Sequence, residues 1–169
     1  FSLAFGDSIN GFIGDPRSYF MFNHVLDGKP WSLGPTIPLV LFAFFQLKFA
    51  IITPALITGT FSEKIRFKSY LIFLSLFSLL IYAPLAHWTW HPEGFLFKLG
   101  VLDFAGGTAV HINAGAAGLA LAIVLGKRHG WRRDPMRPHS LPLVLLGSGL
   151  LWFGWFGFNA GSALGANAT

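Results

Sequence analysis

Residues 103–125 read DFAGGTAVHINAGAAGLALAIVL, and this apolar stretch decides the fold. It exceeds the roughly 20 residues that a helix needs to cross a bilayer. After Asp103 its only ionisable side chain is His111, which has small residues on either side. Ionisable groups at mid-bilayer depth are costly and usually face a bundle interior or a polar pathway. The stretch therefore predicts the pore helix of a membrane transport protein.

The rest of the 169-residue chain has the composition of a membrane protein. Hydrophobic residues make up 53% and charged residues 11%, against about 25% charged in an ordinary soluble domain. We predict an all-α fold, a polytopic transmembrane helix bundle forming one domain over residues 1–169. The expected spans are about 36–60, 69–88, 108–125 and 141–164. The first residues, FSLAF, look like the end of an earlier helix, which suggests a fragment of a longer chain.

The basic residues predict the orientation of these spans. Two short loops, 61–68 and 126–140, contain Lys64, Arg66, Lys68, Lys127, Arg128, Arg132, Arg133 and Arg137. Because short loops rich in Lys and Arg stay in the cytoplasm, the loop 6–35 and the connection 87–102 face outward. The net charge of +5 does not suggest nucleic acid, since it gathers in these loops. The chain has no cysteine, so thiolate metal sites are excluded.

Two residues of the pore helix have competing interpretations. Asp103 can accept the free N–H groups of the first helical turn, and we favour this over attraction of a cation at the mouth. His111 shares a helix face with Gly107, Gly115 and Gly118. A buried histidine bonded to a neighbouring helix and a donor–acceptor ring lining a narrow polar path are equally consistent with that pattern. A single histidine lacks the partner ligands of a metal site.

Aromatic residues cluster near the outer ends of the expected spans. His87 and His91 have the spacing of a metal pair, but a belt of aromatic side chains at the membrane surface explains them better. Trp90 could also attract a small cation through its ring face. In the first and fourth spans, Phe45 precedes Phe49 and Phe158 precedes Ser162 by four residues. Such stripes are more often core or lipid-facing than gates.

Glycines and a lysine complete the pattern of the spans. Gly157, Gly161 and Gly165 form a small-residue ridge, which predicts close helix packing. Lys48 lies mid-span, where a lysine costs about 2.5–3.5 kcal/mol on insertion scales. Three explanations stay open: it extends to the membrane surface, pairs with a group in another helix, or alters the neighbouring gate electrostatically. No nucleophile–base pair or metal cluster is evident, so an enzyme is the least favoured class.

Three motifs resemble those of the ammonium transporter (Amt) family, within the Amt/Rh superfamily. DFAGGTAVHINAGAAG (103–118) is similar to its fifth-helix signature and GWFGFNAGSALGAN (154–167) to its sixth. FAIITPALITGTFSEKIRF (49–67) is similar to its third helix and the following loop. The resemblance covers essentially the whole chain and implies a partial first half of an inverted-repeat transporter, from the end of the second helix to the end of the sixth.

The resemblance implies ammonium/ammonia transport and a role for each matching residue. Trp90 and Ser162 resemble an outer recruitment site, and Asp103 an acidic position that supports it. Ammonium would be deprotonated and conducted past a gate of Phe49 and Phe158, next to aromatic support, and past the first of two pore histidines. The supporting residues are Phe45 and Trp155, and the histidine is His111. The second histidine would lie in the other half, outside this chain.

The resemblance also implies partners and a location. It suggests a homotrimer in the plasma membrane, in contact with lipids, and control by a PII-type signal protein at the cytoplasmic loop 126–140. No cofactor is expected. The alternative function is an ammonium sensor that signals to a cytoplasmic partner. A third, an Rh-type gas channel, is disfavoured by Trp90 and the GWFGFNAGSA stretch.

Overall fold

The computed structural model describes residues 1–166 and is mostly helical. Four helical segments are long and apolar enough to cross a membrane: Leu39–Phe61, Phe67–Lys98, Gly107–Leu125 and Leu141–Gly161. The second segment extends well beyond the expected 69–88. The elements are α1 Ser2–Phe5, β1 Ser8–Ile9, β2 Ile13–Gly14, 3-10 helix η1 Phe20–Phe22, α2 Leu39–Ala55, α3 Thr58–Phe61, α4 Phe67–Phe77, π-helix η2 Ser78–Tyr82, α5 Ala83–Trp90, α6 Phe95–Lys98, π-helix η3 Gly107–Ile112, α7 Asn113–Leu125 and α8 Leu141–Gly161.

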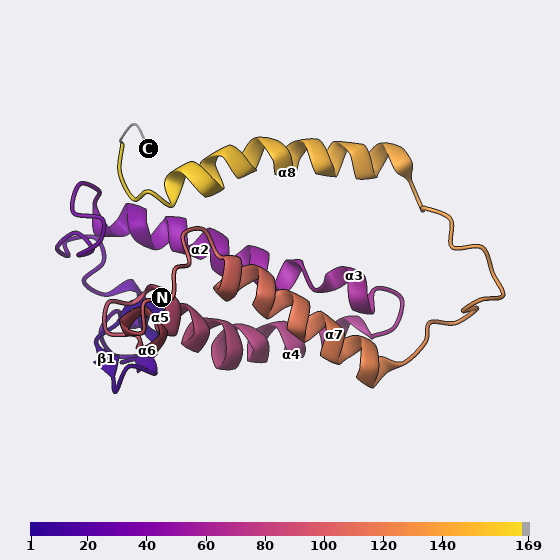
Figure 1. Cartoon of the computed structure of the whole chain (residues 1–169), viewed down its shortest axis with the longest axis horizontal. Helices are drawn as coiled ribbons and strands as arrows, with labels where there is room; N and C mark the ends of the chain where they lie inside the picture. Colours follow the sequence, from indigo (N-terminus) through magenta and orange to yellow (C-terminus); the bar gives the residue numbers. More distant parts are fainter. Residues whose placement is uncertain (167–169) are drawn as a thin grey trace.

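Three of the four segments form one packed group (Figure 1). The segment containing α2 and α3 packs against α7, and η3 packs against α2 and α5. Helix α8 lies along the side of α2 away from α7 (Figure 1). A long connection leads from the end of α7 to the start of α8, at the end of the bundle opposite the N-terminus (Figure 1). None of the α8 residues is buried. Most of the surface of α8 is therefore open in this part of the protein.

Prolines interrupt the helical hydrogen bonding in two of the segments. Pro54 has no N–H to donate, and α2 ends one residue later, before α3 begins at Thr58. Pro84 follows the π-helix η2, in which the N–H of Ala83 donates to the oxygen of Ser78. At Pro54 the span Leu39–Phe61 therefore has a short break between two helices.

The end of the bundle that the basic loops predict to face outward, called the outer end below, is held together by two buried histidines. His87 is fully buried, with its Nδ1 2.9 Å from the Ala4 oxygen and its Nε2 2.8 Å from the Ser8 hydroxyl. The ring of His91, which is also buried, stacks on His87 at 4.4 Å. The prediction that both belong to an interfacial belt is wrong. Both histidines lie at the C-terminal end of α5, which ends at Trp90, and they fasten the N-terminal segment to the bundle through Ala4, Ser8 and Trp31.

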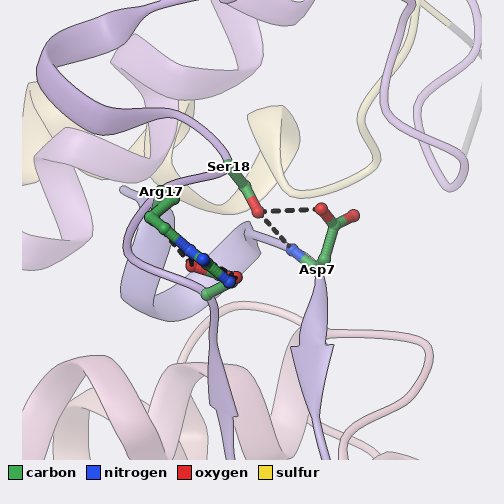
Figure 2. Close-up of polar contacts among 4 residues, drawn as sticks. Asp7, Arg17 and Ser18 are labelled. Atoms are coloured by element: carbon green, nitrogen blue, oxygen red, sulfur yellow. Dashed lines mark hydrogen bonds and ion pairs between the residues drawn. The ribbon is translucent and has the colours of Figure 1, made fainter.

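Polar contacts fix the hairpin that precedes the first span. The strands β1 and β2 pair antiparallel, and the Ser18 hydroxyl bonds to both the N–H and the carboxylate of Asp7 (Figure 2). Next to this pair, Arg17 donates to both oxygens of Asp15, with the Nη2–Oδ2 distance at 2.7 Å. Three charged side chains and one hydroxyl thereby hold the start of the loop 6–35.

This hairpin should tolerate acid. The Arg17 guanidinium hydrogen-bonds to Asp15 and lowers the pKa of that carboxyl from 3.8 to about 2. Because the pKa in the folded state is depressed, the stabilising contribution is present above pH 3.8 and is lost as the pH falls towards 2. We expect the carboxyl carbon of Asp15 to titrate near pH 2 in an NMR titration. In the Arg17→Gln variant it should return towards pH 3.8, and an unchanged midpoint would contradict the assignment.

The opposite end joins the two basic loops. Lys64 donates through Nζ to the Gly126 oxygen at 2.6 Å, and Arg128 forms an ion pair with Glu63 at 3.1 Å. The loop after α3 and the loop after α7 therefore lie at the same end of the bundle. This arrangement is consistent with both loops lying on the cytoplasmic side of a membrane.

Candidate functional site

A cavity of about 470 Å³ opens at the outer end, between α2, α5 and the end of α8. The predicted recruitment residues Trp90 and Ser162 both line it, together with Phe45 and Phe49. The Trp90 indole donates to the backbone oxygen of Asp103 at 2.9 Å, which fixes the plane of the ring. The cavity thus presents a fixed indole next to a hydroxyl, on a wall that is otherwise mostly apolar.

Asp103 supports this cavity in a second way, through its carboxylate. Oδ1 accepts from the N–H of Gly106 at 2.6 Å, and Oδ2 accepts from Thr108 at 2.9 Å and Ala109 at 2.8 Å. The turn that allows this needs a left-handed residue, and Gly106 has φ of +93°. Asp103 therefore caps the pore helix with its side chain and holds Trp90 with its main chain, which accounts for its position beside the site.

Ser162 is oriented so that its oxygen can still accept. Its hydroxyl donates to the Phe158 oxygen at 3.0 Å, one turn earlier on α8. The hydroxyl proton of Ser162 is thus already engaged in a hydrogen bond, and the lone pairs of Oγ remain available to a donor in the cavity. A cationic N–H donor in the cavity would find an acceptor at Ser162 and a π face at Trp90.

Below the cavity the aromatic rings meet in an unbroken series. Phe49 is 2% exposed and lies 4.2 Å from Phe158 and 5.2 Å from Trp90, between ring centroids. Phe45 supports Phe49 at 5.0 Å, and Trp155 stacks on Phe158 at 4.9 Å. Trp155 in turn lies 5.8 Å from His111. The residues predicted for the gate and its support are thus brought together, although they come from separate helices.

Glycines allow α8 to approach α2 at this level. A Cβ on Gly161 would lie 2.6 Å from the Phe45 ring, so that side chain leaves no room for alanine. Gly157, in contrast, has no neighbour within 4 Å in the described structure. The small-residue ridge is therefore a packing seam at Gly161 and is open at Gly157. Asn167, the last residue of the quoted motif, lies outside the described residues.

His111 lies on the π-helix η3, where its N–H donates to the Gly106 oxygen at 3.0 Å. Such short π segments occur often at functional sites. Its side chain is exposed and lines a groove of about 450 Å³ with Leu56, Thr60 and small residues of α7. Within residues 1–166 the ring has no hydrogen-bond partner, so the alternative of a buried histidine bonded to a neighbouring helix is not realised in this part of the chain.

Gln46 is a site residue that the sequence reasoning missed. Its side chain is 8% exposed, and it lines the outer cavity between Phe45 and Phe49. Its Oε1 is buried without a hydrogen-bond partner in the described structure. Buried polar atoms usually have partners. An amide in the middle of the span 39–52, where Lys48 is the only other polar side chain, was the signal that could have identified it.

Other charged groups lie away from this site. The Lys48 side chain is exposed and lines neither the cavity nor the groove, although it adjoins Phe49 in the sequence. Among residues 1–166, no three His, Asp or Glu side chains gather closely enough to hold a metal ion. The described site consists of aromatic rings, the carboxylate of Asp103, the hydroxyls of Ser162, Thr89 and Thr60, the amide of Gln46 and the imidazole of His111.

The family model described as Ammonium Transporter Family matches residues 1–169. The chain belongs to this family. Its members are transporters or channels and not enzymes. The sequence-based predictions of an Amt-type, all-α membrane protein are thereby confirmed.

Several known members of the Ammonium Transporter Family are similar to the chain. An ammonium transporter of Aquifex aeolicus is 51% identical over 169 residues, which are 100% of this chain and 38% of that protein. One from Mycobacterium tuberculosis (strain ATCC 25618 / H37Rv) is 45% identical over 190 residues, 100% of this chain and 40% of that protein. The chain therefore spans about two fifths of the length of these relatives.

Solved structures show the same fold. The crystal structure of Saccharomyces cerevisiae Mep2 superposes with a TM-score of 0.86 at 44% identity, covering 98% of this chain and 38% of that one. A structure described as a Sensor Amt Protein gives 0.83 at 32% identity, over 99% of this chain and 42% of that one. The helices described above correspond to part of the bundle in both.

Proposed function

We propose that residues 1–169 form part of an ammonium transporter domain, and that the full-length protein carries ammonium or ammonia across the plasma membrane. The observation that carries this proposal is the unbroken series of rings from the outer cavity to His111, in a chain of the Ammonium Transporter Family. The series lies between the outer cavity, with its indole and hydroxyl, and the groove that contains His111. That order suits a substrate that enters the cavity as a cation and passes the rings as a neutral molecule.

Recruitment at the outer cavity would combine two attractions. A cation next to the Trp90 face gains from the ring quadrupole, by roughly 0.5–2 kcal/mol. The free lone pairs of Ser162 add a hydrogen bond to a charged donor, of about 1.5–3 kcal/mol. Because Trp90 is already bonded to Asp103, little reorganisation accompanies binding. The cavity would therefore concentrate ammonium from the outer solution.

The gate would admit ammonia and reject cations. The rings of Phe49 and Phe158 are 4.2 Å apart between centroids, so a hydrated ion cannot pass between them unless they move. A bare cation loses its hydration in such an apolar passage at a cost that neutral ammonia does not bear. Ammonium can release a proton before it passes, whereas potassium cannot. In the groove below, the neutral ring of His111 offers ammonia one donor and one acceptor.

The test is uptake of labelled methylammonium by cells that express the full-length protein, together with Trp90→Leu and Ser162→Ala. Saturable uptake that ammonium competes, with a raised half-saturation concentration in both variants, is the expected result. Each variant removes one of the two attractions, so a rise of about 2- to 30-fold is expected for Trp90→Leu and of about 10- to 150-fold for Ser162→Ala. Asp27→Ala, an exposed residue of the outer loop, is the control and should behave as the parent. No saturable uptake by the parent would overturn the transporter proposal.

The gate has its own test. Phe158→Ala should remove the ring opposite Phe49 and let partly hydrated cations through, because the apolar barrier is thinner. In proteoliposomes of the full-length protein, we expect a potassium current that the parent lacks, at a protein density matched by immunoblot. Phe156→Ala is a suitable control, since the Phe156 side chain is 66% exposed on α8. Unaltered selectivity in Phe158→Ala would contradict the gate assignment.

A second candidate function is sensing, favoured by the likeness to the Sensor Amt Protein. The same outer cavity would then bind ammonium and signal to a cytoplasmic partner without net transport. Binding by the full-length protein without uptake would select this function. For either function we propose a homotrimer in which each subunit has its own pore. We also propose that the basic loop 126–140 is the docking site for a PII-type signal protein.

A further inference from the structure

We propose that Thr60 is a second polar binding station in the conduction groove, taking neutral ammonia from His111 near the inner end. The inference rests on the proposed transport function and adds a ligand-contacting residue to it. Thr60 belongs to α3, and it lines the same groove of about 450 Å³ as His111. The other residues that line it are Leu56, Ala114, Gly115, Gly118, Leu119 and Ala122, all apolar or glycine. His111 and Thr60 are therefore its two polar side chains.

The hydroxyl of Thr60 is held over the helix that carries His111. A Cβ added to Gly118 would lie 2.9 Å from Thr60 Oγ1, so the oxygen occupies the space that this glycine leaves free. Gly118 is seven residues after His111, which places the hydroxyl about 10 Å further along α7. The inner loops begin just beyond this level, where Lys64 meets Gly126.

The hydroxyl of Thr60 is also free of hydrogen bonds within the described residues. The hydroxyls of Thr53, Thr58 and Thr89 each donate to a main-chain oxygen of the preceding turn. Thr60 makes no hydrogen bond to any of residues 1–166. Its donor and both of its lone pairs thus remain available in the groove. Neutral ammonia has one lone pair and three N–H groups, which match that combination.

The physical consequence is a lower barrier along an otherwise apolar groove. A small amine that leaves His111 would cross about 10 Å without a hydrogen bond if Thr60 were apolar. A hydrogen bond to Thr60 in that stretch stabilises the ammonia molecule before it returns to water. Because the contact lies past the ring series, it should affect the rate at saturation and leave recruitment at Trp90 and Ser162 unchanged.

The experiment measures ammonium-evoked currents or uptake in proteoliposomes of the full-length protein, for Thr60→Val, Thr60→Ala and Thr60→Ser. Losing one hydrogen bond should lower the maximal rate between about two- and tenfold in the Val and Ala variants, with the half-saturation concentration unchanged. Thr60→Ser keeps the hydroxyl and should retain the parent rate. Thr58→Val is the matched control, because the hydroxyl of Thr58 is already bonded to the Ala55 oxygen.

Each outcome bears on the proposal. An unchanged maximal rate in Thr60→Val and Thr60→Ala, with an active parent, overturns the Thr60 station and leaves the transport function standing. A Thr60→Ser rate as low as that of Thr60→Ala shows a packing role and also overturns it. If the parent itself binds ammonium without transporting it, the transport proposal fails and Thr60 loses its role with it. Melting temperatures of all variants in detergent should stay within a few degrees of the parent.

Discussion

Replacing Asp103 with alanine is expected to abolish transport by the full-length protein and to destabilise it. The carboxylate accepts three backbone N–H groups at the start of the pore helix. Hydrogen bonds to a charged group each contribute about 1.5–3 kcal/mol, so a loss of about 3 kcal/mol or more of unfolding free energy is expected. The turn that positions the Asp103 oxygen under the Trp90 indole would relax as well. Thermal unfolding in detergent and methylammonium uptake are the two measurements.

The Asp103→Asn variant tests whether the negative charge of the side chain is needed in addition to its size and shape. The amide has nearly the same size but only one acceptor oxygen, and its NH₂ group would face an N–H donor. We expect reduced thermal stability and strongly impaired uptake at normal membrane abundance. Asp27→Ala, exposed in the outer loop, controls for loss of a negative charge on the same side. Parent-like uptake and stability in Asp103→Asn would show that Asp103 neither caps the pore helix nor supports the site through its charge.

His111→Leu is expected to lower the maximal rate of ammonium transport by about 10- to 100-fold. The imidazole is the polar side chain that faces the end of the ring series, 5.8 Å from Trp155. Leucine keeps the groove apolar and filled but offers ammonia neither a donor nor an acceptor, a loss of about 1–3 kcal/mol. The measurement is the rate of ammonium-evoked current in proteoliposomes, normalised to the amount of inserted protein.

The His111 experiment needs a control and a rescue. His129→Leu removes an exposed histidine in the inner loop and should leave the rate unchanged. His111→Asn retains a donor and an acceptor in a shorter side chain and should recover part of the rate. A His111→Leu protein that transports ammonium at the parent rate would show that the imidazole does not line the conduction path.

Much of the site followed from the sequence because its signals are local. A carboxylate three residues before a Gly-Gly-Thr helix start predicts capping, and the bonds from Asp103 to Gly106, Thr108 and Ala109 are those of such a cap. The basic loops likewise predicted a common end, and Lys64 and Gly126 meet there. These features depend on neighbours along the chain and on counts of charge.

Other features required the tertiary structure. His87 and His91 looked like belt residues, because aromatic neighbours and a following proline suggested the end of a helix. They are buried instead, because the N-terminal segment folds over both rings: Ala4 and Ser8 contact His87, and Trp31 packs against His91. The exposure of a side chain depends on which segment covers it, and no local pattern reports that.

The sequence by itself determined the family, the four segments apolar and long enough to span a membrane, and the candidate residues of the site. Hydropathy and motif spacing carry this information, because crossing a bilayer constrains each helix separately. Only the tertiary structure decided that Trp155 lies between Phe158 and His111, that Gln46 Oε1 is buried without a partner among residues 1–166, and that Thr60 lies over Gly118. These are contacts between separate helices, fixed by how side chains of different segments interlock, and such packing has no signature within one segment.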